Sequence, residues 1–253
     1  MSNDSSNQSH VPWNPWLGVG SAIGIFFIAQ FLAAIPVGIV YSLTGGSLNN
    51  IGDIANNIGL QFLTILVIEA LIVGAICLFL RFYKTSLAVI GLRRPRWSDL
   101  AYALAAIPFY FGLYLVTVAV VTAFVPELNV NQQQEIGFNN PSGALQLSLT
   151  FLALVVLPPI AEEILFRGFI YSSLKKGLPI AGAVVVTSGL FAIAHLPAGG
   201  EAGPLYIAAI DTFVLSLVLI YLREKTGGLW SSMTLHAIKN GVAFAALFIL
   251  HVR

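Results

Sequence analysis

The sequence predicts an all-α membrane protein, a multi-pass transmembrane helical bundle of about seven spans (six to eight), and three observations support this prediction. Of the 253 residues, 57% are hydrophobic and only 9% are charged, whereas a soluble domain is about 25% charged. Seven stretches reach or approach the length of about 20 apolar residues with which a helix crosses the hydrocarbon core. Tryptophans stand at the edges of these stretches, where amphipathic rings prefer the lipid interface: Trp13, Trp16, Trp97 and Trp230.

The same composition argues against several classes of protein. A chain with so few charges cannot cover a water-facing surface, which disfavours a soluble enzyme, a disordered chain and a nucleic-acid-binding protein. The net charge of +1 favours no polyanionic partner. Cys77 is the only cysteine, which excludes an internal disulfide and a multi-cysteine metal cluster.

The expected domains follow the hydropathy along the chain. Residues 1–16 form a polar tail without Lys or Arg, unlike the start of a cleaved signal peptide. Residues 17–143 hold three accessory spans and a basic amphipathic segment at 84–99, expected to rest on the cytoplasmic lipid surface. Residues 144–253 hold the core in spans four to seven. The spans are expected at 17–43, 58–80, 101–125, 144–176, 180–196, 205–222 and 229–250. A kink at Pro158 and Pro159 would change this count if it marked a re-entrant segment or an extra span.

The basic residues predict an orientation for these spans. Nine Lys and Arg lie in loops on one side of the expected bundle, and only Arg253 lies on the other. The positive-inside rule places the nine in the cytoplasm. We therefore expect a cell membrane protein, bacterial by default, with a cytoplasmic N-terminus and an outer C-terminus. The nine are Arg81, Lys84, Arg93, Arg94, Arg96, Lys175, Lys176, Arg223 and Lys225.

Ionisable groups inside the expected spans are candidates for a functional site, because burying a charge in a bilayer is costly. Arg167 follows Glu163 by one helical turn and shares its face, while the adjacent Glu162 points about 100° away. One carboxylate can then pair with the Arg while the other remains free for chemistry. The candidates are Glu69, Glu162, Glu163, Arg167, His195, Asp211, His236 and Lys239, with Asn240 as a buried amide.

The spacing also brings a carboxylate and an imidazole to the same depth. Glu162 and His195 lie about 16 residues on either side of the turn at 177–179, so both are roughly 24 Å from it on antiparallel helices. His236 and Asn240 share one face of the last span. Their expected depths, roughly 12 and 18 Å from its cytoplasmic end, agree less well with the depth of Glu162.

These residue types can hydrolyse an amide bond in two ways. A carboxylate and an imidazole can hold and deprotonate a water, while a second imidazole and an amide donate hydrogen bonds to the developing oxyanion. Alternatively, a divalent metal such as zinc, held by His195, His236 and Glu162, can activate the water. The residues leave both schemes open.

Three motifs give the chain its resemblance to a known family. Glu162–Arg167 read Glu-Glu-x-x-x-Arg, Phe191–His195 read Phe-x-x-x-His, and His236–Asn240 read His-x-x-x-Asn. All three occur in order, each in an expected span. The chain thereby resembles the CPBP family of intramembrane proteases, also called the Abi family, which includes CAAX prenyl proteases and bacteriocin-processing enzymes. The resemblance covers about residues 150–245.

The resemblance implies a role for each motif residue. Glu162 and His195 look like the pair that activates the attacking water, and Glu163 with Arg167 looks like the supporting pair. His236 and Asn240 look like the groups that stabilise the transition state. The family is often labelled metalloprotease, although a metal-free, glutamate-dependent mechanism is attributed to its prenyl-protein members.

We therefore expect an intramembrane endopeptidase that cleaves a membrane-associated protein or peptide. CAAX-type C-terminal processing, leader or bacteriocin processing, and cleavage of a small membrane protein are all open, and no oligomeric state is indicated. Two alternatives remain. Glu69 and Asp211 are also what an ion-coupled transporter would carry, and a non-enzymatic immunity or partner protein would need no reactive water.

Overall fold

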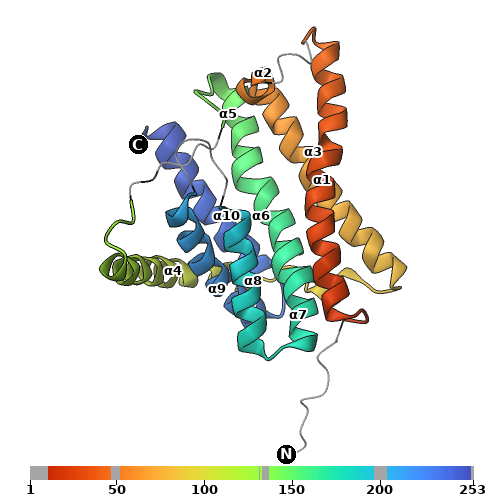
Figure 1. The fold of residues 1–253 in the computed structure, drawn as a ribbon, viewed down its shortest axis with the longest axis vertical. Helices are drawn as coiled ribbons and strands as arrows, with labels where there is room; N and C mark the ends of the chain where they lie inside the picture. Colours follow the sequence, from red (N-terminus) through yellow and green to blue (C-terminus); the bar gives the residue numbers. More distant parts are fainter. Residues whose placement is uncertain (1–10, 47–51, 131, 133–136, 197–203, 252–253) are drawn as a thin grey trace, which may run out of the picture.

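The computed structural model describes residues 11–46, 52–130, 132, 137–196 and 204–251, and its regular secondary structure there is entirely helical. Six helical segments within these ranges are long and apolar enough to cross a membrane. They are α1 (Pro15–Leu43), α3 (Ile58–Phe82), α4 (Trp97–Phe124), Gly143–Gly177, α9 (Tyr206–Thr226) and Trp230–Ile249. The predicted multi-pass helical bundle is therefore confirmed (Figure 1).

Two of these segments change their helical geometry along their length. Gly143–Gly177 comprises α5 (Gly143–Phe151), η3 (Leu152–Val156), α6 (Leu157–Glu162), η4 (Glu163–Ile170) and α7 (Tyr171–Gly177). The last segment comprises α10 (Trp230–Phe244) and η6 (Ala245–Ile249). The pieces η3, η4 and η6 are π-helical, a wider winding that is uncommon and is frequent at functional sites.

The fifth expected span, at 180–196, is shorter than predicted. Helix α8 (Ile180–Ala194) has 15 residues, which reach roughly 22 Å, less than the roughly 30 Å of a bilayer core. The helix ends at His195, its C-terminal cap. Helix α8 packs against α9, α7 and η4, and Figure 1 shows it beside α7.

Local signals account for the helix boundaries. Asn14 caps α1, where its side chain accepts from the backbone N–H of Trp16, and Pro15 occupies the first turn. Asn57 caps α3 in the same way. Gly227 ends α9 with φ of 68°, a left-handed conformation that glycine adopts without steric cost.

The basic segment predicted at 84–99 contains only one short helix, η2 (Leu87–Ile90). Ile90 is fully buried, and Arg93 pairs with Asp99 and donates to the carbonyl of Thr226. These contacts hold the segment against the turn between α9 and α10. Its contact with a lipid surface remains a prediction, as does the polar tail at 1–16, most of which lies outside the described residues.

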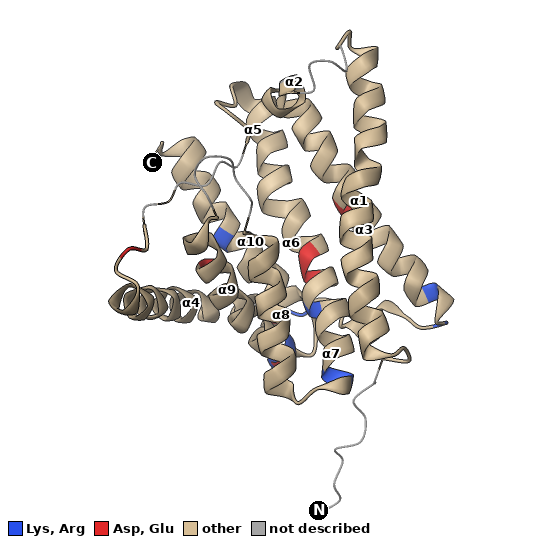
Figure 2. Cartoon of the chain, viewed as in Figure 1, with Lys and Arg blue, Asp and Glu red and all other residues tan. Residues whose placement is uncertain are grey.

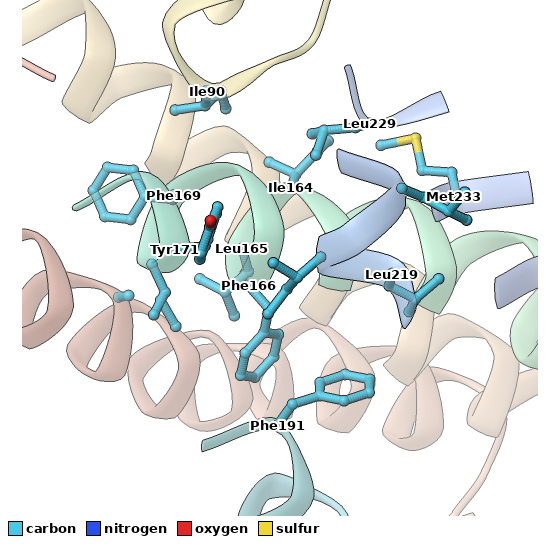
Figure 3. Close-up of a cluster of buried hydrophobic side chains, with 14 of the residues drawn as sticks. Ile90, Ile164, Leu165, Phe166, Phe169, Tyr171, Phe191, Leu219, Leu229 and Met233 are labelled. Carbon is cyan, nitrogen blue, oxygen red and sulfur yellow. The ribbon is translucent and has the colours of Figure 1, made fainter. Parts of the chain in front are cut away.

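The centre of the bundle is the helix that carries the adjacent glutamates. Every residue of η4 is buried, and its side chains pack with residues from η2, α8, α9 and α10 (Figure 3). Large apolar side chains are exposed along α1, α3 and α4, as expected where a helix faces lipid. Figure 2 shows acidic residues at the lower end of α6 with a basic residue close below, deep in an otherwise sparsely charged bundle.

Candidate active site

The ion pair predicted within the first motif is present and fully buried. The Nη1 atom of Arg167 donates to Oε1 of Glu163 at 2.8 Å, and both side chains have no exposed surface. The guanidinium carbon of Arg167 also lies 4.1 Å from the centroid of the Phe191 ring. A charge in this environment requires such partners, because leaving it unpaired would cost several kcal/mol.

Both adjacent glutamates approach the same imidazole. Nδ1 of His236 lies 3.1 Å from Oε1 of Glu163, and Nε2 lies 3.7 Å from Oε2 of Glu162. The helical spacing had suggested that the two carboxylates point about 100° apart, with Glu163 paired to Arg167 and Glu162 free. The imidazole reaches both because α10 packs against α6, so that one ring bridges side chains that point in different directions.

His195 joins Glu162 from the opposite helix, as their equal distance from the turn predicted. Nε2 of His195 lies 3.9 Å from Oε2 of Glu162. Nδ1 of His195 lies 2.9 Å from the carbonyl oxygen of Phe191. Because a carbonyl only accepts, Nδ1 carries the hydrogen and Nε2 of the neutral ring is an acceptor that faces Glu162.

The side chain of Asn240 is hydrogen-bonded to the backbone of the helical segment Gly143–Gly177. Its Nδ2 atom donates to the carbonyl oxygen of Leu154 at 3.0 Å. Pro158 and Pro159 follow Leu154 by four and five positions. Neither proline has the backbone N–H that would donate to the Leu154 carbonyl in a regular helix. The amide of Asn240 therefore satisfies a carbonyl that the two prolines leave unpaired.

The structure gives Phe191, the first residue of the second motif, contacts with three ionisable side chains. Its ring centroid lies 4.5 Å from that of His195 and 5.8 Å from that of His236, in addition to its contact with Arg167. It also packs edge-on against Phe166, beside which it lies in Figure 3. The signal was present in the sequence, because Phe191 is one turn before His195 and heads the second motif.

Asp211 and Lys239 form a separate polar cluster. Nζ of Lys239 lies 2.9 Å from Oδ2 of Asp211, so two of the candidate ionisable residues pair with each other. The hydroxyl of Tyr110 donates to Oδ1 of the same aspartate. The sequence gave no indication of Tyr110, because a tyrosine in a long apolar helix has no distinguishing pattern.

The suggested metal ligands do not assemble into a metal site. Among the residues that the structure describes, no group of three His, Cys, Asp or Glu side chains is placed to hold one ion. The Nδ1 atom of His236 is directed to Glu163, and that of His195 to a backbone carbonyl. We therefore assign no metal ligands here and derive no step through a metal.

The fold and site define a class of protein: a membrane-embedded helical bundle with a buried cluster of two carboxylates, two imidazoles and a guanidinium. Residues 144–242 match the family model described as type II CAAX prenyl endopeptidase, Rce1-like. No curated protein and no solved structure matches the chain. Residues 144–242 thus carry the match to CAAX-type proteases that the three motifs predicted, and this range contains all three motifs. The match identifies the protein as a peptidase.

Proposed function

We propose that the chain is an intramembrane endopeptidase in which Glu162 and His195 activate the attacking water. The observation that carries this proposal is the position of the Glu162 carboxylate, whose Oε2 atom lies 3.9 Å from Nε2 of His195 and 3.7 Å from Nε2 of His236. Polar atoms at such separations are too far apart for a direct hydrogen bond but are well placed to share one water.

The Glu162 carboxylate and Nε2 of His195 can each accept one hydrogen of a single water molecule. A water about 2.8 Å from each would donate one hydrogen to Glu162 and the other to Nε2 of His195. Its lone pairs would then face away from both, toward an approaching carbonyl carbon. The water oxygen bonds to that carbon as one proton passes to Glu162, and the tetrahedral intermediate forms. The carbon–nitrogen bond then breaks, its electron pair stays on nitrogen, and the nitrogen takes the proton from Glu162.

His236 would stabilise the negative charge of that intermediate. Its Nδ1 atom donates to Glu163, so Nε2 can donate only when the ring carries both hydrogens as an imidazolium. Arg167 in turn compensates Glu163, which fixes the orientation of His236. Asn240 would contribute with the second hydrogen of its amide nitrogen, since the first is given to Leu154.

The substrate class and the membrane follow the family. We propose CAAX-type or leader-type processing of a membrane-associated peptide in the cell membrane, with the basic loops in the cytoplasm. The peptidase family disfavours the transporter and the non-enzymatic partner as alternatives.

A cleavage assay in liposomes tests the catalytic roles. Glu162→Gln and His195→Ala are expected to lower kcat roughly 10²- to 10⁴-fold, the range for a positioned acid–base group. The matched control is Glu224→Gln, because Glu224 is paired with Lys175 at 2.6 Å, outside the candidate site. Wild-type cleavage rates in Glu162→Gln would refute the proposed mechanism.

A further inference from the structure

Arg223 is a partly exposed cation in the last turn of α9. Its Nε atom is buried and has no hydrogen-bond partner among the described residues. A guanidinium carries five N–H donors and no acceptor, and a donor buried without an acceptor is costly. The candidate active site makes no use of Arg223, so its charge requires an explanation of its own.

Positive charge is in excess at this end of the bundle. The segments 81–99, 175–179 and 223–230 hold nine Lys and Arg but only two acidic residues. The segments are joined to one another, because Arg93 donates to the carbonyl of Thr226 and a salt bridge links the second segment to the third. Figure 2 shows basic residues at the ends of α3 and α7, toward the same side of the bundle. An anion is therefore attracted to this end of the molecule.

Both acidic residues at this end already have a basic partner. Asp99 accepts two hydrogen bonds from Arg93, at 2.9 and 2.5 Å. Glu224 pairs with Lys175 at 2.6 Å. In the part of the chain that the structure describes, Arg223 has no carboxylate within ion-pair distance. The protein thus supplies Arg223 with no anion at contact distance.

Glycines let two guanidinium groups lie against one small piece of backbone. A Cβ atom at Gly91, whose φ is 86°, would overlap the guanidinium of Arg223. A Cβ atom at Gly228 would overlap the side chain of Arg93 in the same way. The N–H of Leu229 donates to the carbonyl of Gly91 at 3.1 Å, which joins the two glycine segments. Two positive charges are thereby held beside a single turn.

Two tryptophans indicate the depth of this turn in the membrane. Trp97 begins α4 and is 88% exposed, and Trp230 begins α10. The indole of Trp230 donates to the carbonyl of Arg93. Indole rings prefer the lipid headgroup region, and Arg223 lies within one turn of the end of α9. The guanidinium of Arg223 is therefore at the level of lipid phosphates.

The chemistry of the site fits a phosphate group and, among lipids, an anionic one. The planar fork of an arginine presents parallel N–H groups that match two oxygens of a phosphate. A zwitterionic headgroup would also bring a cation, which would meet excess positive charge and no unpaired carboxylate among the described residues. Basic pockets between membrane helices bind anionic headgroups for this reason.

We propose that Arg223, lying on the turn formed by Gly91 and Gly228, binds the phosphate group of an anionic phospholipid, with Arg93 as a second positive charge beside it. The bound headgroup gives the N–H donors of Arg223 the acceptor that the described residues do not supply. It also links the turn between α9 and α10 to the segment after η2. The site is separate from the candidate active site, so it does not depend on the proposed function.

A lipid titration tests the site. The protein in a nonionic detergent is titrated with short-chain phosphatidylglycerol or phosphatidylcholine, and the thermal unfolding midpoint gives an apparent Kd. Arg223→Gln is expected to weaken the apparent Kd for phosphatidylglycerol roughly 10-fold, the scale of one charge-assisted hydrogen bond. Arg223→Lys keeps the charge without the fork and should lie between, and it replaces Arg223→Gln if that variant does not fold.

The matched control is Arg81→Gln, which removes an exposed cation from the last turn of α3 at the same end of the bundle. Its apparent Kd should stay within about twofold of the wild type, because a solvated surface charge contributes little. Equal losses in Arg81→Gln and Arg223→Gln would show attraction by net charge alone and would overturn the proposal.

Two further comparisons distinguish the source of the phosphate. Phosphatidylcholine that binds as tightly as phosphatidylglycerol would contradict the preference for an anionic lipid. Inorganic phosphate is expected to compete with phosphatidylglycerol, because both present the same oxygens. Inorganic phosphate that stabilises the wild type while phosphatidylglycerol does not would refute the lipid as the occupant.

Discussion

The side chain of Phe191 contacts three ionisable groups of the site. Its ring meets the guanidinium of Arg167 and both imidazoles, and its backbone carbonyl accepts from His195. An aromatic face attracts a buried cation by about 0.5–2 kcal/mol, and the ring also restricts the orientation of both histidines. A side chain that reacts with nothing can therefore determine how well the reactive ones are aligned.

We expect Phe191→Leu to lower kcat/KM roughly 5- to 30-fold, which corresponds to about 1–2 kcal/mol of lost alignment. The substitution keeps an apolar side chain, so the fold should be retained. The same liposome assay measures this effect, and Phe248→Leu is the matched control because Phe248 packs in a separate cluster. Equal activity of Phe191→Leu and the control would show that the ring only fills space.

At the scale of elements, the kinked segment 143–177 is held in shape from outside. Its two prolines leave the carbonyl of Leu154 without a donor, and Asn240 on α10 supplies one at 3.0 Å. The contact joins the helix that carries the glutamates to the helix that carries His236. Asn240, which the motif predicts to be catalytic, thus also has a structural role that the motif does not indicate.

This structural role predicts that substitutions at Asn240 and Pro158 have coupled effects on the free energy of unfolding. Asn240→Leu is expected to lower the free energy of unfolding by about 1–3 kcal/mol, the cost of an unsatisfied buried carbonyl. In a Pro158→Ala background the cost should be smaller, because alanine restores the N–H four residues after Leu154. Thermal unfolding of the four proteins in detergent gives the double-mutant cycle, and strictly additive losses would contradict the assignment.

At the scale of the whole molecule, a second polar cluster ties an accessory helix to the family core. Tyr110 on α4, Asp211 on α9 and Lys239 on α10 meet at one point. The side chains of Asp211 and Lys239 are 18% and 24% exposed, so the pair is partly screened by solvent or lipid headgroups. The cluster lies outside the candidate active site, and it anchors α4 against α9 and α10.

Removing one charge of the Asp211–Lys239 pair should destabilise the fold more than removing both charges. Lys239→Met is expected to destabilise the fold by about 1–3 kcal/mol, because it leaves the carboxylate of Asp211 without its cation. The double variant Asp211→Asn with Lys239→Met removes both charges and should recover part of the loss. Unfolding midpoints in detergent measure both, and a double variant as unstable as the sum of the single variants would show that the pair is not a unit.

The sequence by itself determined the class, six of the seven expected spans, the three motifs and the pairing of Glu163 with Arg167. Hydropathy and the spacing of residues on a helix are local properties, and the equal distance of Glu162 and His195 from one turn needed only helix rise. The tertiary structure decided the rest. It ended α8 at His195, placed His236 between two carboxylates and assigned Asn240 to a backbone carbonyl. These outcomes depend on how helices distant in the chain pack together, and on a π-helical winding whose register no local pattern encodes.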